Sequence, residues 1–215
     1  DMQYRVQNQR GGDASTRAQV YRQLEVAFNE PSTSGVSATM DRFWASWQSL
    51  VNRPDDQATR AFVVEEGRNL STTINRVRQQ MNLQRDNTAE TARYTVDEVN
   101  AIADEIAQLN VQIVAVTGVD QQPNDLMDQR DLLLDRLSKL VETNNVYGPS
   151  GEVNVYIGGR ALVARDEART LALDDTGGVL SVVWQEDGTT APVSGGSLNA
   201  LLDVYNVDFP TAIGE

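Results

Sequence analysis

Neither cysteine nor histidine occurs among the 215 residues of this chain. Their absence excludes disulfides, thiolate nucleophiles, zinc sites built from cysteine or histidine, and catalysis that needs an imidazole base. The single lysine, Lys139, lies within a helical pattern and not after a glycine-rich turn, so the sequence contains no P-loop. No apolar run approaches the ~20 residues that a membrane span needs, and residues 1–5 do not resemble a cleaved signal segment.

Basic residues are scarce relative to acidic ones, 18 against 31, which gives a formal net charge of −13. This balance opposes nucleic acid and anionic membrane as partners. Every basic residue except Lys139 is an arginine, which suits forked ion pairs between helices. With 40% apolar residues the chain can bury the core of one good-sized domain or two small ones. Because it opens on Asp1, we expect it to be a fragment processed or cut from a longer protein.

Helical periodicity predicts two helices in the first 53 residues. The spacing of Val20 and Leu24 predicts a helix over residues 15–28, and Gly11-Gly12 should weaken any helix before it. Residues 29–35 are a connector rich in cap and breaker residues. Two tryptophans on the second helix predict a large buried anchor, which we favour over a ligand-stacking platform. The apolar stripe of this second helix is Val36, Met40, Phe43, Trp44, Trp47, Leu50 and Val51.

A third helix of unusual length is predicted over residues 56–117, because no proline occurs between Pro54 and Pro123. Asp55 or Asp56 can cap its start. Its middle is polar, so we expect looser packing there. The apolar stretches are Leu70, Ile74, Val77 and Met81, then Val99, Ile102, Ile106, Leu109, Ile113 and Val116; the polar stretch between them is Gln84, Thr88, Thr91 and Thr95.

A turn at residues 118–123 leads into a fourth helix that begins near Asn124 or Asp125. Such a short connection makes the third and fourth helices antiparallel neighbours. In this register Arg136 is expected beside Asp104 or Glu105. The leucines that define the fourth helix are Leu126, Leu132, Leu133, Leu134, Leu137 and Leu140, followed by Val141.

After residue 142 the apolar period changes from helix to strand. Strands are predicted at residues 145–147, 153–157, 160–163, 170–173 and 180–185, with Gly158-Gly159 as a two-residue hairpin. Residues 194–197 then begin a helix that carries Leu198, Leu201, Leu202 and Tyr205, which Pro210 only delays or kinks. The fold class is therefore mainly α with a small β region, a long antiparallel helical bundle or coiled coil with β-hairpins.

No residue pattern predicts an active site. Asp128, Asp131 and Asp135 share one helical face and could hold a cation, but nearby Arg130 and Arg136 favour an ion-paired surface. Residues 174–178 resemble part of a calcium loop yet lack its spaced ligands, so a β-turn is favoured. Asn69 starts a glycosylation acceptor inside the long helix, where chance is the better explanation. Carboxylate pairs of a glycosidase lack any pocket-forming pattern. We expect no catalytic, cofactor-binding or metal site, and no enzyme.

Four segments of the chain, residues 21–32, 124–135, 153–159 and 194–198, carry motifs in an order that resembles the bacterial flagellar hook-associated protein 1 family, whose members join the hook to the filament. Residues 21–32 resemble its "LE…FNEPS" motif, and Phe43-Trp44, Trp47 and residues 52–55 continue the match. Residues 124–135 resemble its "NDLLDQRDLLLDEL" helix. Residues 153–159 are similar to its hairpin, and residues 194–198 to its "SGGxLGGLL" segment, with Asn199-Ala200 in place of paired glycines.

The resemblance implies a rod related to the D1 domain of flagellin: a helix bundle over residues 1–144, a β-hairpin region over 145–193 and the start of a returning helix over 194–215. It implies a structural subunit of the extracellular flagellum, exported by the flagellar secretion apparatus. The implied partners are the hook protein, the next junction protein and, in the full-length protein, further copies in a ring. The terminal segments of the family are absent, so we expect a monomer. The alternative is a coiled-coil signalling or adhesin module without a flagellar role.

Overall fold

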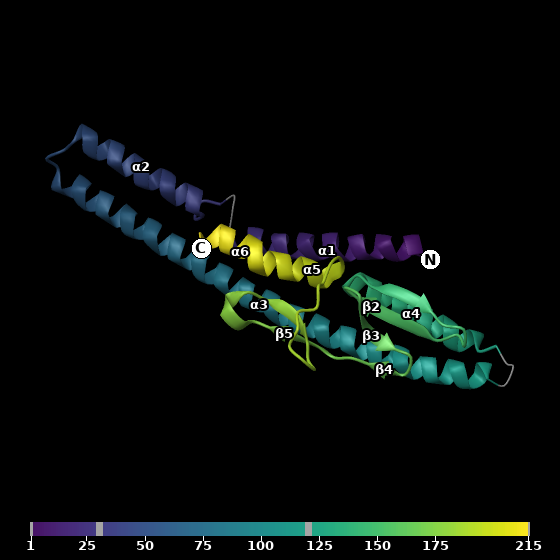
Figure 1. The fold of residues 1–215 in the computed structure, drawn as a ribbon. Coiled ribbons are helices and arrows are strands. Elements are labelled where there is room, and N and C mark those ends of the chain that lie inside the picture. Colours follow the sequence, from purple (N-terminus) through teal and green to yellow (C-terminus); the bar gives the residue numbers. More distant parts are fainter. Residues whose placement is uncertain (1, 29–31, 119–121, 215) are drawn as a thin grey trace.

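One very long helix, α3 (Gln57–Thr117), runs through the whole length of the molecule, and the other helices lie alongside it (Figure 1). The fold is described from a computed structural model, which describes residues 2–28, 32–118 and 122–214. The other helices are α1 (Met2–Phe28), α2 (Val36–Asn52), α4 (Asn124–Leu140), α5 (Gly196–Asp203) and α6 (Phe209–Ile213). This mainly helical rod with a small β region confirms the predicted fold class.

The predicted bounds of α3 are confirmed to within one residue. Asp56 caps its start, accepting hydrogen bonds from the backbone N–H of Ala58 at 3.1 Å and from Oγ1 of Thr59 at 2.6 Å. The helix has 61 residues, so it is about 90 Å long at 1.5 Å per residue. It therefore sets the length of the molecule.

The polar middle of α3 is buried in part, since Thr88 and Thr95 are buried, Gln84 is half-buried and Thr91 is exposed, and the looser packing expected there stays a prediction. Thr88, Ala92 and Thr95 are all buried against the rest of the fold. The hydroxyls of Thr88 and Thr95 donate to the carbonyls of Gln84 and Thr91, at 2.9 and 2.8 Å, and so need no other partner. Small side chains with satisfied hydroxyls let neighbouring elements approach the helix closely.

Helix α1 passes without a break through Gly11 and Gly12, which corrects the expectation of a weakened helix before residue 15. A Cβ atom built on Gly12 would lie 2.2 Å from the carbonyl oxygen of Lys139, at the end of α4. Gly12 therefore allows the backbones of α1 and α4 to touch. The contact between helices outweighs the weak helix propensity of glycine.

The tryptophans of α2 are exposed, so the prediction of a buried aromatic anchor is wrong. The side chains of Trp44 and Trp47 are 58% and 44% exposed, whereas Thr39 and Ser46 are buried. Phe43 packs near Gly67 of α3, 3.4 Å from a Cβ atom built there. The α2 face that meets α3 is thus made of small residues and Phe43, and the tryptophans lie on its flank.

Helix α4 folds back along the last part of α3, as predicted, but one ion pair differs. Arg136 pairs with Glu98 at 2.5 Å and not with Asp104 or Glu105. Glu98 lies about two turns nearer the start of α3, within reach of a long guanidinium side chain. The turn expected at residues 118–123 lies partly outside the described residues, since residues 119–121 are not described.

Two small antiparallel sheets cover one side of α3. The first has strand order β1 (Asn144–Tyr147), β2 (Val153–Ile157), β3 (Arg160–Ala164) and β4 (Glu167–Ala168), and the second pairs β5 (Leu171–Asp174) with β6 (Ser181–Trp184). The five predicted strands are confirmed, whereas β4 was not predicted. Buried and half-buried side chains alternate along β2. This alternation produces the two-residue apolar period from which the strand was predicted.

Asparagine side chains attach these strands to helices. Asn110 of α3 accepts from the N–H of Val153 at 3.0 Å and donates to its carbonyl at 2.8 Å. Asn100 does the same with Leu171, at 2.9 Å in both directions. Each amide therefore replaces a neighbouring strand by matching both hydrogen-bonding groups of one residue.

The returning helix lies beside α1 and is built in three parts: α5, a π-helical turn η2 (Val204–Asp208) and α6. Leu198, Leu201 and Phe209 are buried in the core that α1, α3 and the sheets share. The π turn precedes Pro210, whose ring and missing N–H disturb a regular α-helix, so the expected delay or kink is confirmed as a wider turn.

Arg17 of α1 holds this returning helix in place. Its guanidinium pairs with Asp13 of the same helix at 2.9 Å and with Asp203 of α5, and lies 4.0 Å from Asp208. Partial burial lowers the pKa of Arg17, but the hydrogen bonds to Asp13 and Asp203 outweigh it and raise the pKa overall. The arginine therefore stays charged and links α1 to the C-terminal helices.

Candidate functional site

Two of the three aspartates of α4 that could have formed a cation site, Asp131 and Asp135, form ion pairs with α1, whereas Asp128 is exposed at the surface. Arg5 reaches Asp135 at 2.9 Å and Asp131 at 3.9 Å, and the Arg5 side chain is only 12% exposed. The ion pairing favoured by the sequence is confirmed for Asp131 and Asp135. Of the two arginines named for it, Arg130 lies 3.7 Å from Asp131, whereas Arg136 pairs with Glu98, and Arg5 of α1 is a partner that the sequence did not predict. Among the described residues no group of three acidic side chains is placed to hold a metal ion. The absence of a metal site stays a prediction.

Arg130 is buried, which the sequence did not predict. Only 3% of the residue is exposed, and its Nη1 donates to the carbonyl of Gly151 in the turn between β1 and β2. Its guanidinium also lies over the ring of Tyr147, 5.3 Å from the centroid. Arg130 therefore fixes the β1–β2 turn against α4, because its hydrogen bond and ring contact both go to that hairpin.

The two other candidate sites are residues 174–178 and Asn69. The first forms a turn and the second lies inside α3, as predicted. Asp174 ends β5, and its carboxylate accepts hydrogen bonds from the hydroxyl and then from the N–H of Thr176, and these two bonds lower the pKa of Asp174. That contact is an Asx-type turn, in agreement with the β-turn interpretation. Asn69 is exposed within α3, in regular helix. Whether either binds or carries anything stays a prediction.

Arg160 joins the two sheets. It pairs with Asp187 at 2.8 Å and with Glu186 at 3.1 Å, and lies over the ring of Trp184 at 4.7 Å. The pKa of Asp187 is lowered to about 2, first by the Thr189 hydroxyl, then by the Thr189 N–H and by Arg160. This cluster is exposed and structural, because every charged group in it has a partner.

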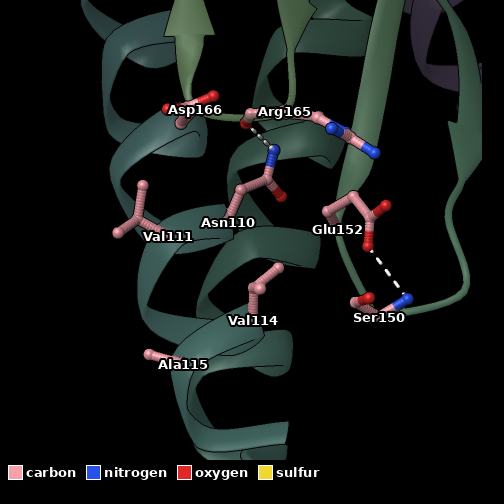
Figure 2. A pocket seen from close by; sticks show the side chains of 8 residues that line it. All are labelled: Asn110, Val111, Val114, Ala115, Ser150, Glu152, Arg165 and Asp166. Atoms are coloured by element: carbon pink, nitrogen blue, oxygen red, sulfur yellow. Dashed lines mark hydrogen bonds between the residues drawn. The ribbon is translucent and has the colours of Figure 1, made fainter. Parts of the chain in front are cut away.

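A pocket of about 430 Å³ lies between the last part of α3 and the turns of the first sheet (Figure 2). Val111, Val114 and Ala115 of α3 form one wall, and Glu152 and Arg165 come from the sheet side. Glu152 is buried and accepts a hydrogen bond from the Ser150 N–H at 3.0 Å. Asp166 of the β3–β4 link also lines the pocket, so an apolar wall faces two carboxylates and one guanidinium. The pocket provides no nucleophile paired with a base.

Arg165 has a backbone conformation that is rare for its residue type. Its φ is 57°, the only positive φ at a non-glycine position among the described residues. The two-residue link between β3 and β4 requires it, and the N–H of Arg165 donates to Asn154 at 2.8 Å while its carbonyl accepts from Asn110 at 2.6 Å. A link of this length normally carries glycine or asparagine at such a position. The Arg165-Asp166 dipeptide is the signal for the pocket in the sequence, and a strand link was not predicted there.

The fold defines an elongated, mainly α-helical domain with two small antiparallel sheets beside its longest helix. No helix among the described residues is long and apolar enough to cross a membrane. The sequence profile described as the flagellar hook-associated protein FlgK helical domain matches residues 21–215, and the chain belongs to this family.

Individual relatives agree with the family. The flagellar hook-associated protein 1 of Bacillus subtilis (strain 168) is 35% identical over 151 residues, which are 70% of this chain and 30% of the relative. That of Escherichia coli (strain K12) is 33% identical over 144 residues, 66% of this chain and 26% of the relative. The solved structure of the flagellar hook junction protein FlgK from Burkholderia pseudomallei shares the fold, with a TM-score of 0.79 at 24% identity over 94% of this chain and 38% of that chain. The chain thus spans about 30% of the curated relatives it matches.

Proposed function

We propose that this chain is a structural domain of a flagellar junction protein, standing between hook and filament. The family match over residues 21–215 carries the proposal. It is supported by the rod shape, in which one helix spans the whole domain, since a continuous helix resists bending and stretching along its axis (Figure 1). The coiled-coil signalling or adhesin alternative has no comparable support.

The partners and the location are part of this proposal. The full-length protein would contact the hook protein on one side and the next junction protein on the other, and would form a ring with further copies. It would reach the outside of the cell through the flagellar secretion apparatus. Residues 1–144, 145–193 and 194–215 would act as the bundle, hairpin and returning-helix parts of one rod.

The domain would work without catalysis, a cofactor or a metal. The chain lacks histidine and cysteine, and the charged groups around Arg5 and Arg160 are held in ion pairs. The isolated domain would be a monomer, because its net charge of −13 makes copies repel one another at low salt. Light scattering over a range of concentration and salt tests this, and ordered tubes from the domain alone would contradict it.

Electron microscopy of assembled flagella tests the proposed position. The full-length protein would carry a small label at Gly177, an exposed turn residue with open space around it. We expect label only at the boundary between hook and filament. A control with the label on flagellin should decorate the whole filament. Label spread along the filament, or absent from flagella while the protein accumulates in the cell, would contradict the proposal.

A further inference from the structure

The pocket beside the β3–β4 link carries an excess of negative charge (Figure 2). Its charged groups are the carboxylates of Glu152 and Asp166 and the guanidinium of Arg165. None of the three forms an ion pair with a described residue. Two carboxylates against one guanidinium leave one net negative charge in the pocket, so its electrostatics favour a positively charged occupant.

Glu152 is a buried carboxylate with one oxygen left over. Only 6% of the residue is exposed, and Oε2 accepts a hydrogen bond from the Ser150 N–H at 3.0 Å. Oε1 has no hydrogen-bond partner among the described residues. A buried charge is unfavourable unless it is paired and hydrogen-bonded. Because Glu152 lines the pocket, a cationic hydrogen-bond donor bound there would supply what this carboxylate lacks.

The neighbouring turn leaves space for this carboxylate. A Cβ atom built on Gly148 would lie 2.1 Å from Oε1 of Glu152. The φ of Gly148 is not positive, so its backbone conformation does not require glycine. The side chain missing at this position therefore makes room for the carboxylate, and the turn is built around a buried negative charge.

The apolar wall of the pocket suits the stem of a long basic side chain. Val111 and Val114 are 51% and 39% exposed. Arginine and lysine lay their methylene groups along apolar surface and keep the charged end on polar groups. Arginine fits two carboxylates better than lysine does, because its planar guanidinium has five N–H donors in a fixed fork.

An acidic face of α3 leads along the rod to this pocket. Asp97 and Asp104 precede Val111 at seven-residue intervals, and a step of seven residues turns only about 20° around a helix, so the three share one face. Both aspartates are exposed, and neither forms an ion pair with a described residue. No lysine or arginine occurs between Arg93 and Arg130. The negative surface therefore extends about 21 Å beyond the pocket and would attract a basic segment of another protein.

We propose that the pocket binds an arginine side chain from a basic segment of a neighbouring protein in the flagellum. The arginine stem packs against Val111 and Val114, and its guanidinium pairs with Glu152 and Asp166. The rest of the segment lies along the acidic face of α3. A second copy of this chain is disfavoured as the occupant, because a net charge of −13 makes copies repel one another. The inference rests on the proposed structural role and gives the chemistry of one contact that this role requires.

A titration of this chain with Nα-acetyl-arginine methylamide, followed by NMR, tests the pocket itself. We expect the amide signals of Val111, Val114 and Gly151 to shift and saturate together. The citrulline analogue has nearly the same shape without the charge and should bind about tenfold more weakly. The guanidinium ion lacks the stem and should also bind about tenfold more weakly. Equal binding of citrulline would rule out the ion pair, and equal binding of guanidinium would show a site for a bare cation and contradict the proposal.

Charge variants at the pocket should change the affinity in opposite directions. Glu152→Gln keeps an acceptor for the Ser150 N–H but removes the charge, so it should weaken binding about tenfold. Arg165→Gln removes a like charge and should strengthen binding about threefold. Glu167→Gln is the matched control, because Glu167 is exposed next to Asp166 but does not line the pocket, and its effect should stay within about twofold. Equal losses in the Glu152 and Glu167 variants, or a loss in the Arg165 variant, would contradict a cation bound at Glu152.

Asp166→Asn provides a second carboxylate variant that does not depend on the buried residue. Asp166 is exposed, so its replacement should leave the fold intact and weaken binding about threefold. Urea unfolding shows whether each variant is folded. Unchanged affinity in the folded variants of both carboxylates would overturn the proposal.

Photo-cross-linking of the full-length protein tests the occupant in assembled flagella. A benzophenone amino acid would replace Val111 in the pocket and, as the matched control, Val179, a valine of similar exposure that lies before β6. We expect the Val111 position to give one cross-linked peptide of another flagellar protein, with an arginine close to the attachment point. The Val179 position should not give that peptide.

The outcomes separate this contact from the proposed function. Absence of the protein from flagella would overturn the proposed function. Normal incorporation without a cross-link at Val111 would overturn the contact and leave the function intact. A cross-link to a second copy of this chain, or to a segment without arginine, would do the same.

Discussion

At the scale of single residues, Arg165 is held in a conformation that its side chain disfavours. A non-glycine residue with φ of 57° is strained by contact between its Cβ atom and its own backbone, and glycine is not. Its carbonyl accepts a hydrogen bond from Asn110 and its N–H donates to Asn154, and these two contacts hold the backbone in this conformation.

Replacing Arg165 with glycine should therefore stabilise the domain by about 0.5–1 kcal/mol. Urea unfolding of the two proteins measures the difference. Arg165→Ala is the matched control, because it removes the guanidinium but keeps the Cβ atom, and it should bring no such gain. Equal stabilisation by alanine and glycine would show that the side chain, and not the backbone, is unfavourable here.

Asn110 is the best-satisfied buried polar group in the described part of α3. Only 1% of the residue is exposed, and its amide makes three hydrogen bonds, two to Val153 and one to Arg165. Leucine of similar size would leave those three backbone groups buried without partners.

Asn110→Leu should lower the free energy of unfolding by about 2–4 kcal/mol. Thermal and urea unfolding provide the measurement. Asn69→Leu is the control on the same helix, because Asn69 is exposed, and its effect should stay within about 0.5 kcal/mol. A small effect of Asn110→Leu would mean that the first sheet is held to α3 by its apolar contacts alone.

At the scale of elements, the two adjacent glycines of α1 have opposite roles. A side chain on Gly12 would collide with the backbone of Lys139, whereas nothing lies within 4 Å of the Cβ position of Gly11. Gly12 is needed for helix packing, whereas Gly11 can be replaced by a residue of higher helix propensity without a steric clash.

Gly12→Ala should therefore destabilise the domain by about 1–3 kcal/mol, because α1 and α4 must separate. Gly11→Ala should stabilise it by up to about 1 kcal/mol through helix propensity. Comparing the two variants by urea unfolding isolates the contact, since both make the same chemical change. A gain in both would contradict the close approach of α1 and α4.

The elements were predicted well where one face of the chain is buried. The three-to-four-residue spacing of Val99, Ile102 and Ile106 and the alternation of Val153, Val155 and Ile157 are local patterns that burial imposes directly. Gly12 could not be interpreted in the same way, because its value depends on Lys139, which is 127 positions away. The exposure of Trp44 and Trp47 was not predicted either, because their spacing indicates that they share one face of a helix but not whether that face is covered.

The candidate site was less predictable than the fold. The sequence placed Asp131 and Asp135 on one face correctly, yet their partner Arg5 comes from another helix. Arg130 looked like a surface charge, because its burial depends on the Gly151 carbonyl and the Tyr147 ring of a later hairpin. The pocket was not predicted, because it arises only where α3 and the β3–β4 link meet.

At the scale of the whole molecule, burial is distributed unevenly along α3. Eleven residues of α3 between 92 and 113 are buried, among them Val99, Ile106 and Ile113. Among residues 57–76 only Val63 and Glu66 are buried. At this end α3 packs against α2 alone, whose tryptophan flank is exposed. We call α2 and residues 57–76 of α3 the tip.

Because helix stability in proteins comes mostly from tertiary packing, the two ends of α3 should open with different free energies although they form one continuous helix. Native-state hydrogen exchange of this chain is the measurement. Amides of residues 95–113 should exchange only through global unfolding, and those of residues 57–70 through local opening with little dependence on urea. The exposed tryptophan flank of α2 supports this expectation, because the tip could gain stability there only if another surface covered Trp44 and Trp47. Equal protection along all of α3, with the same urea dependence at every amide, would contradict this expectation. It would show that α3 unfolds as a single unit and that the continuous helix itself stabilises the tip.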